Sequence, residues 1–105
     1  AVTGVSGSGP AYVFHLIETL AAAGIAEGLP RRLAFDLASK TVAGAGALAQ
    51  VSEETPEQLR INVTSPNGTT QAALDVLMDP ITGFGPLLQR AVRAASARSK
   101  ELSGE

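Results

Sequence analysis

Apolar residues recur at helical spacing along most of the chain, and turn-forming residues separate the periodic stretches. The first stretch, residues 11–27, is apolar on nearly every side, which is typical of a deeply buried helix. It follows Ser8-Gly9-Pro10, where proline near a helix start costs no hydrogen bond, and it ends at Gly28, a good helix-terminating residue. The pattern therefore predicts a buried helix that closes in a turn before Pro30.

A second helix is predicted over residues 31–51. Its apolar positions recur at helical spacing: Leu33, Leu37, Thr41, Ala45 and Leu48. Gly44 and Gly46 stand in its interior, where each glycine costs about 1 kcal/mol relative to alanine. That cost is tolerable where another helix backbone comes close, so we expect close packing at these two glycines.

Three further helices are predicted over residues 56–63, 70–78 and 84–102. Thr55-Pro56-Glu57-Gln58 has the pattern of an N-cap, a first-position proline and a capping-box glutamine. Clusters of turn residues at 64–70 and 79–83 separate the later helices. No period-2 segment is long enough for a strand, so the predicted fold class is all-α, with about five helices in a single domain over residues 1–105.

The composition indicates a partner surface. Charged residues make up 17% of the chain, against about 25% in ordinary domains. A small domain with so few charges is expected to hide part of its surface. The net charge of −2 and the scarcity of aromatic residues, at 4%, give no reason to expect nucleic acid.

Several other classes of protein are disfavoured. Without cysteine there is no disulfide and no thiolate metal site, and the single histidine, His15, has no ligand pair nearby, so no metal is expected. No run of roughly 18 apolar residues predicts a membrane helix. The absence of cysteine is compatible with a cytoplasmic location, which we expect.

The turn cluster at 64–70 is the best candidate for chemistry. A loop that enters a helix presents backbone N–H groups without intrahelical acceptors, and these can bind a carboxylate or phosphate. Gly68 leaves room for an anion to approach, while Ser65, Thr69 and Thr70 add hydroxyl groups. The residues alone leave two interpretations open: an ordinary capped turn, or a small-anion site.

Two other segments are weaker candidates. Gly7-Ser8-Gly9-Pro10-Ala11 faintly resembles a dinucleotide turn, but no strand precedes it and Pro10 lacks an amide, so we expect no cofactor-binding residue in this chain. Glu53 and Glu54 precede a helix start, where negative charge is favourable, and the residues alone favour solvated first-turn carboxylates over a functional role.

Residues 56–74, PEQLRINVTSPNGTTQAAL, closely resemble the signature segment of pyrroline-5-carboxylate reductases. Residues 6–12 resemble the segment that opens the same family's helical domain. Gly24, residues 28–30 and residues 98–102 also fall where that family has them. The resemblance covers essentially the whole chain in order. Asn67 stands where the family usually has a second glycine, and asparagine tolerates a left-handed backbone, so we expect the turn to be kept. Met78 stands where a polar residue is more usual.

The resemblance implies a two-domain enzyme that reduces 1-pyrroline-5-carboxylate to L-proline with NADPH or NADH. The cofactor would be bound mainly by an N-terminal Rossmann domain absent from this chain, while this C-terminal domain would interlock with its twin as a homodimer or higher homo-oligomer. The fragment alone would be inactive.

Carried over by position, the resemblance also implies site residues. Backbone amides around Gly68 and Thr69, with Asn67 in the same turn and Ser65 beside it, would hold the substrate carboxylate. Thr70 would share in this binding and act as the catalytic residue. Its hydroxyl would form a hydrogen bond to the ring nitrogen. Glu53 matches an acidic position near that nitrogen in some members.

Two alternatives have no redox role: a non-enzymatic helical dimerisation module, and a small-anion-binding regulatory domain. A Gly-rich βαβ region upstream in the natural chain would favour the reductase, whereas another kind of domain there would favour one of these alternatives.

Overall fold

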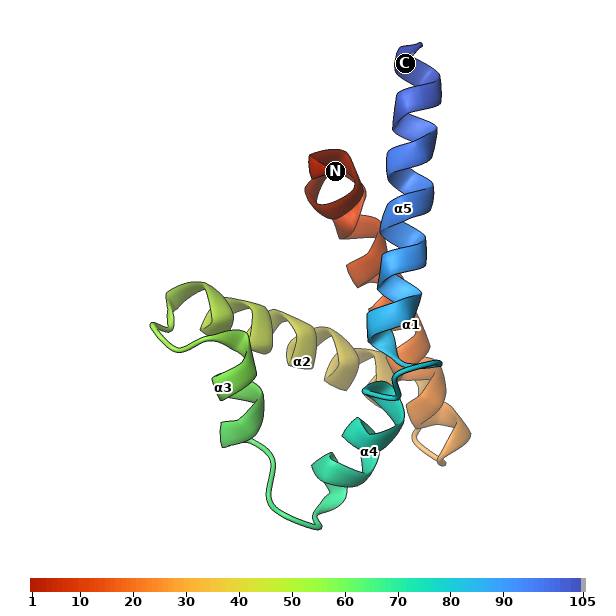
Figure 1. Cartoon of the computed structure of the whole chain (residues 1–105). Coiled ribbons are helices and arrows are strands. Elements are labelled where there is room, and N and C mark those ends of the chain that lie inside the picture. The colour runs from red at the N-terminus through yellow and green to blue at the C-terminus, as the bar shows by residue number, and fades with distance from the viewer. Residues whose placement is uncertain (105) are drawn as a thin grey trace. The chain divides into compact units, whose positions relative to one another are not determined.

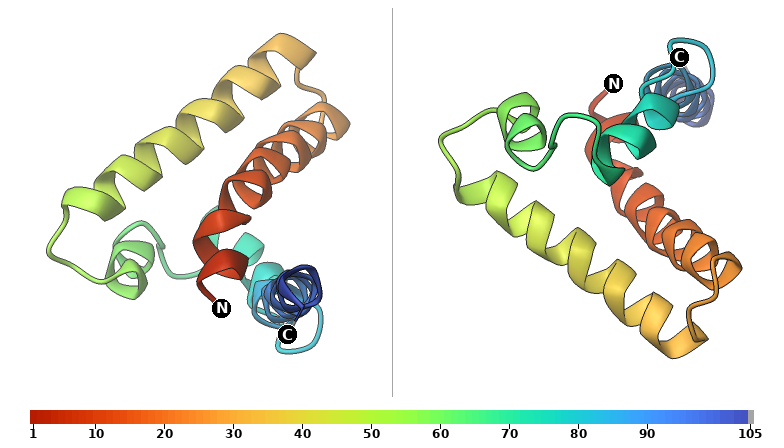
Figure 2. Two further views of the ribbon diagram at one scale, coloured as in Figure 1. Left: turned by 90° about the horizontal axis from the view of Figure 1, so that it is seen from above. Right: turned by 90° about the horizontal axis from the view of Figure 1, so that it is seen from below.

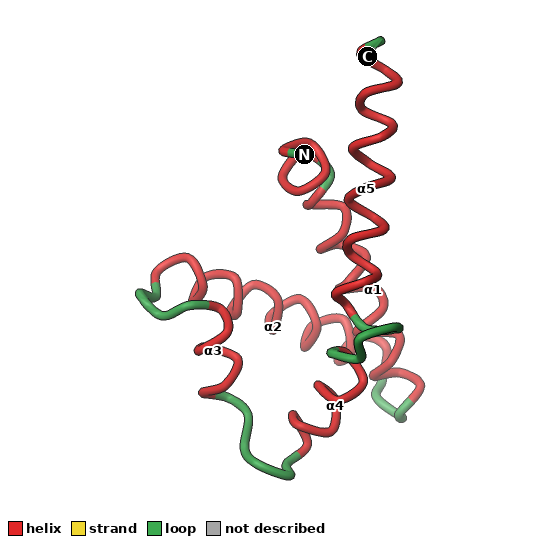
Figure 3. Tube along the Cα trace, viewed as in Figure 1, coloured by secondary structure: helices red, strands yellow, loops and turns green. Residues whose placement is uncertain are grey.

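The computed structural model describes residues 1–104, and every regular element in that range is a helix (Figures 1 and 3). The elements in chain order are the π-helix η1 (Thr3–Gly7), α1 (Gly9–Ala26), α2 (Arg31–Val51), α3 (Pro56–Asn62), α4 (Thr69–Leu77) and α5 (Phe84–Ser103). The all-α prediction is confirmed, and all five predicted helices are present with small shifts at their ends. The short η1 was not predicted. No helix in the described range is both long and apolar enough to cross a membrane.

The chain divides into two compact units. One contains residues 9–55, with α1 and α2, and the other contains residues 1–8 and 56–104, with η1, α3, α4 and α5. Each unit is described by itself below.

The turn between α1 and α2 follows from Gly28. Its φ of 105° lies in the left-handed region that glycine adopts without strain. The Leu29 amide donates to the Gly24 carbonyl at 3.0 Å, and the Gly28 amide donates to the Ile25 carbonyl at 3.0 Å. These are the two bonds of a Schellman motif, which satisfies the last carbonyls of α1. A Cβ at Gly24 would lie 3.1 Å from Leu29 Cδ1, so the small residue lets the turn fold back closely.

Small residues join α1 to α2. Ala21, Ala34 and Ala38 are the buried apolar residues of the described chain. Ile17, Ile25 and Phe35 pack around them. The two helices lie close together at the Gly28 turn and separate toward their other ends (Figures 1 and 2). The hairpin therefore has a thin core that covers only one side of each helix.

The expectation that the first helix is deeply buried is wrong for the single chain. Phe14 is 65% exposed, and Val13, Leu16 and Leu20 are also exposed. The close packing expected at Gly44 and Gly46 is likewise missing, because a Cβ at either position would meet no atom within 4 Å. The sequence pattern correctly marks these helices as apolar all round, but α2 covers only one side of α1.

In the other unit, η1 packs on α5. Gly4 is buried, and a Cβ there would lie 3.0 Å from both Ser96 Oγ and the Val92 carbonyl oxygen. The two backbones can approach only because position 4 has no side chain. This contact ties the start of the chain to the last helix.

The turn between α4 and α5 is organised by Asp79. Its Oδ1 accepts the Thr82 amide at 2.9 Å and the Ile81 amide at 2.8 Å. These backbone hydrogen bonds, that of Thr82 first, lower the pKa of Asp79 below its usual value. The Gly83 amide donates to the Asp79 carbonyl at 2.9 Å and closes the turn.

Gly83→Ala is expected to destabilise the protein by about 2 kcal/mol, the usual cost of overpacking. Gly83 is buried, and a Cβ there would overlap the Leu77 carbonyl and lie 2.5 Å from the Asp79 carbonyl oxygen. Thermal unfolding of the two proteins measures the effect. The matched control is Gly85→Ala, where a Cβ meets nothing within 4 Å, and a Gly83→Ala melting curve equal to that of the control would contradict the prediction.

Candidate anion site at the start of α4

The loop before α4 is a tight turn centred on Pro66 and Asn67. The Gly68 amide donates to the Ser65 carbonyl at 3.1 Å. Asn67 has φ 59°, the one positive φ outside glycine in the described residues. Proline at the second position followed by a left-handed residue at the third is the pattern of a type II turn. The expectation that asparagine would keep the turn is confirmed.

The effect of a substitution at Asn67 on stability should depend on how readily the new residue adopts a left-handed backbone. Asn67→Gly is expected to leave stability within about 0.5 kcal/mol, whereas Asn67→Val should cost about 1–2 kcal/mol because a β-branched residue resists the left-handed region. Urea unfolding of the three proteins distinguishes these outcomes. If Asn67→Val and Asn67→Gly unfolded at the same midpoint urea concentration, the turn would have relaxed to another conformation in the valine variant.

Thr64 joins the turn to α3. Its hydroxyl donates to the Arg60 carbonyl at 2.6 Å, and its amide donates to the Ile61 carbonyl at 3.0 Å. Both of its donors are therefore used inside the protein. Thr64 positions the loop and has no donor left for a ligand.

The first turn of α4 carries three successive backbone donors without acceptors. Gly68 is the N-cap and provides no side-chain cap, and the Ala72 amide makes the first bond of the helix, to the Gly68 carbonyl at 3.2 Å. Within residues 1–104, the amides of Thr69, Thr70 and Gln71 have no hydrogen-bond acceptor. Such groups carry the positive end of the helix dipole.

The free amides, those of Thr69, Thr70 and Gln71, differ at both ends from the expected amides, those of Gly68, Thr69 and Thr70. The Gly68 amide was predicted to bind the anion, but the Ser65 carbonyl already accepts it. The Gln71 amide was missed, although any helix leaves its first amides unpaired, so the position of the helix start could have indicated it.

The loop also presents free hydroxyl groups. Ser65, Thr69 and Thr70 make no side-chain hydrogen bond to any other described residue, and Thr70 is half-buried while the other two are exposed. Free amides and hydroxyls together can bind a small anion through one group and donate to a second atom of the same ligand.

Glu53 is exposed between α2 and α3 and belongs to the unit of residues 9–55, whereas Ser65, Asn67, Gly68, Thr69 and Thr70 belong to the other unit. The predicted role of Glu53 near the ring nitrogen stays a prediction. Met78, the departure from the signature, caps the far end of α4, where its Sδ accepts Arg60 Nη1 at 3.5 Å. The departure therefore lies away from the loop.

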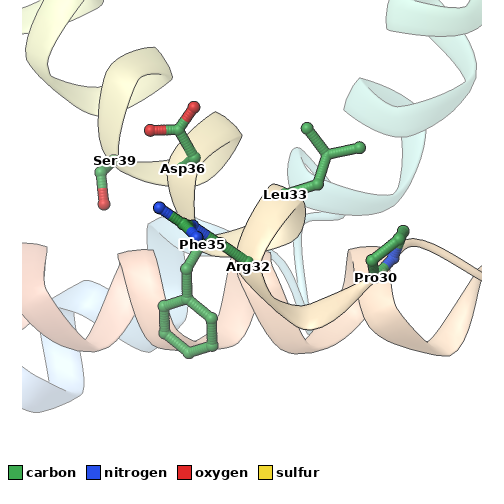
Figure 4. A pocket seen from close by; sticks show the side chains of 6 residues that line it. All are labelled: Pro30, Arg32, Leu33, Phe35, Asp36 and Ser39. Carbon is green, nitrogen blue, oxygen red and sulfur yellow. The ribbon is translucent and has the colours of Figure 1, made fainter.

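A hollow on the hairpin unit contains none of these residues. It is lined by Pro30, Arg32, Leu33, Phe35, Asp36 and Ser39, on the first turns of α2 (Figure 4). Phe35 extends toward α1, and its ring lies 4.9 Å from the Arg31 guanidinium carbon. The contact between Arg31 and Phe35 offers no arrangement for catalysis.

The glycine-rich segment at residues 7–11 does not form a dinucleotide-binding turn. Gly7 ends η1 and Gly9 begins α1, so the glycine-rich segment is helical, and no strand in the described range could form a βαβ unit with it. A phosphate-binding turn of this kind needs a glycine-rich loop that is not helical and a βαβ unit that contains it.

Comparisons with known proteins agree with the all-α fold. The family model for pyrroline-5-carboxylate reductase dimerisation matches residues 1–102. A pyrroline-5-carboxylate reductase of Pisum sativum is 53% identical over 103 residues, covering 98% of this chain and 37% of that protein.

Two solved structures have the same fold. A pyrroline-5-carboxylate reductase from Coxiella burnetii superposes with a TM-score of 0.90 at 42% identity, over 96% of this chain and 37% of that one. The pyrroline carboxylate reductase of Plasmodium falciparum, solved with NADP bound, gives a TM-score of 0.87 at 37% identity, over 95% of this chain and 40% of that one. The fold thus defines a helical dimerisation domain. The chain belongs to the pyrroline-5-carboxylate reductase dimerisation family, as the resemblance implied.

Proposed function

We propose that this chain is the C-terminal dimerisation and carboxylate-binding domain of an enzyme that reduces 1-pyrroline-5-carboxylate to L-proline with NADPH or NADH. The chain spans about 37% of the Pisum sativum relative's length, so it corresponds to one part of such an enzyme. As the family resemblance implies, an N-terminal Rossmann domain outside this sequence would bind most of the dinucleotide. The single observation that carries the proposal is the set of free donors at the start of α4, in a chain of this family.

The substrate carboxylate would bind to the amides of Thr69, Thr70 and Gln71. Each hydrogen bond to a charged group contributes about 1.5–3 kcal/mol, so two or three could hold a small carboxylate. The Ser65 hydroxyl is placed in the same turn and would donate to a second carboxylate oxygen. Asn67 would contribute through the turn conformation that it allows.

The Thr70 hydroxyl would donate to the ring nitrogen. Hydride addition to the carbon of a C=N bond moves electron density onto the nitrogen, which must then gain a proton. A hydrogen-bond donor already in place stabilises the nitrogen as this charge develops. No acidic or basic side chain lies within the turn itself, so positioning is the main contribution of this loop. Glu53, contributed by a partner subunit, is a further candidate near the nitrogen.

The test is a titration with L-proline, followed by amide chemical shifts, on the full-length protein and on this chain alone. The amides of Thr69, Thr70 and Gln71 should shift in the full-length protein, with a smaller change at Gly68. The isolated chain should be helical and dimeric, without reductase activity or nicotinamide binding. NADPH binding to the isolated chain would contradict the division of roles, and shifts confined to other residues would contradict the site.

The same titration separates the alternatives. Binding of phosphate but not L-proline would favour an anion-binding regulatory domain, and binding of neither would favour a dimerisation module. A cytoplasmic location remains a prediction, which fractionation of cells that express the full-length protein would check.

A further inference from the structure

The Gln71 side chain is directed away from the free amides of α4. Gln71 is the third residue after the N-cap Gly68, the position from which a glutamine can reach back and accept the N-cap amide in a capping box. Here its Nε2 instead donates to Asp75 Oδ1 at 2.9 Å, one turn further along the helix. The Gly68 amide donates to the Ser65 carbonyl at 3.1 Å, so the loop backbone takes the place of that side-chain cap.

Gln71 has the one side chain in the first turn of α4 that could close this helix start. The N-cap is glycine, and the hydroxyls of Thr69 and Thr70 make no hydrogen bond to another described residue. Both hydroxyls are on short side chains, whereas the Gln71 carboxamide has a long stem and a carbonyl acceptor. The three amides therefore stay open for a ligand because the Gln71 side chain is held forward.

The effect that charge alone would give Asp75 has the opposite sign. Asp75 is exposed, and within residues 1–104 no cationic side chain pairs with it. Its carboxylate lies four residues after Gln71, a rise of about 6 Å along the helix axis. A negative charge on this helix opposes the attraction of its positive end for an anion. Charge alone thus predicts that Asp75 weakens binding of a carboxylate, so the sign of its effect is diagnostic.

We propose that Asp75 is a positioning residue that accepts the Gln71 side chain and thereby keeps the amides at the start of α4 open for the substrate carboxylate. Without this acceptor the Gln71 carboxamide can fold back, and its Oε1 competes with the substrate for the same donors. The inference rests on the proposed function. It adds a residue that acts through Gln71 and does not touch the substrate.

The test is Asp75→Ala in the full-length enzyme. The Michaelis constant for 1-pyrroline-5-carboxylate should rise about fivefold, which corresponds to about 1 kcal/mol, a typical contribution of a helix cap. The value of kcat should change by less than about twofold, because the Thr70 hydroxyl is untouched. A Michaelis constant that stays the same, or falls as charge alone predicts, would overturn the inference.

Two further variants separate the hydrogen bond from the charge and from helix stability. Asp75→Asn removes the charge but keeps an Oδ1 acceptor, so its Michaelis constant should stay within about twofold of the wild-type value. Asp75→Ala placed in a Gln71→Ala enzyme should leave the Michaelis constant of that enzyme unchanged, since no side chain remains to fold back. A rise of about fivefold in that background as well would assign the effect to helix stability and overturn the inference.

A measurement without ligand separates this inference from the proposed function. Amide hydrogen exchange in the full-length protein should slow at least about twofold at one or more of Thr69, Thr70 and Gln71 in Asp75→Ala, and not in the double variant Asp75→Ala/Gln71→Ala. Equal exchange in the wild type and Asp75→Ala would overturn the inference. Slower exchange in Asp75→Ala, together with no shift of these amides by L-proline in the wild type, would support the hold on Gln71 and overturn the proposed carboxylate site.

Discussion

Thr70→Ala in the full-length enzyme is expected to lower kcat about 100-fold, the lower end of what a positioned proton donor contributes. Thr70 is half-buried and its hydroxyl has no hydrogen-bond partner in the described residues, so the hydroxyl is free for the proposed hydrogen bond to the ring nitrogen. Its removal leaves the nitrogen without a placed donor as its charge changes. The backbone amide of residue 70 remains, so the Michaelis constant for 1-pyrroline-5-carboxylate should change by less than about threefold.

Two matched variants separate the hydroxyl from its neighbours. Thr70→Ser keeps the hydroxyl and should retain most of the turnover, whereas Thr69→Ala removes an exposed hydroxyl one residue away and should have little effect on kcat. Steady-state kinetics of the three variants, with thermal unfolding to verify folding, gives the comparison. Near-normal turnover of Thr70→Ala would move the proton donor to another residue, with Glu53 the next to test.

The helices could be predicted from the sequence because local chemistry sets their ends. Gly28 before Pro30 terminates α1 through hydrogen bonds that span only six residues, and the Asp79–Gly83 turn is closed by its own backbone and one carboxylate. The left-handed conformation of Asn67 was likewise predictable, because it depends on the residue and its neighbours. Short-range effects of this kind are readable from the order of residues alone.

Burial could not be predicted, because it depends on what covers each helix. The apolar residues around Phe14 indicate a buried helix, and they are exposed here because α2 covers only one side of α1. The same reason explains why Gly44 and Gly46 indicate close packing that the chain does not supply. A sequence shows that a helix surface is apolar, but it does not show what covers that surface.

The free backbone amides at the start of α4 differ by one position from those that the sequence predicted. The loop and its hydroxyls follow from the turn cluster and the helix start, but the identity of the free amides depends on which carbonyl the turn uses. Because Ser65 accepts the Gly68 amide, the free donors move one position along, to Thr69 through Gln71. The place of Glu53 relative to the loop depends on long-range structure, and no local pattern specifies it.

Gly68→Val is expected to have the second large effect, which is on the Michaelis constant for 1-pyrroline-5-carboxylate and not on kcat. Gly68 has φ −87° and ψ −175°, which any residue can adopt, so backbone strain is not the cause. A Cβ there would lie 3.2 Å from the Ser65 carbonyl oxygen and 3.4 Å from Ser65 Cβ, so Ser65 must shift by a few tenths of an ångström. The branched side chain of valine is then expected to crowd the approach to the free amides.

The Michaelis constant for 1-pyrroline-5-carboxylate should rise about 30-fold, which corresponds to the loss of one hydrogen bond to a charged group, about 2 kcal/mol. The value of kcat should fall by less than about threefold, since the Thr70 hydroxyl stays on the helix. Gly68→Ala, with one carbon at the same 3.2 Å contact, should give an intermediate rise, and Asn67→Gly should give none, because it keeps both the turn and the open approach. An unchanged Michaelis constant in a folded Gly68→Val enzyme would show that the carboxylate binds elsewhere, and the free amides at the start of α4 would then be an ordinary solvated helix end.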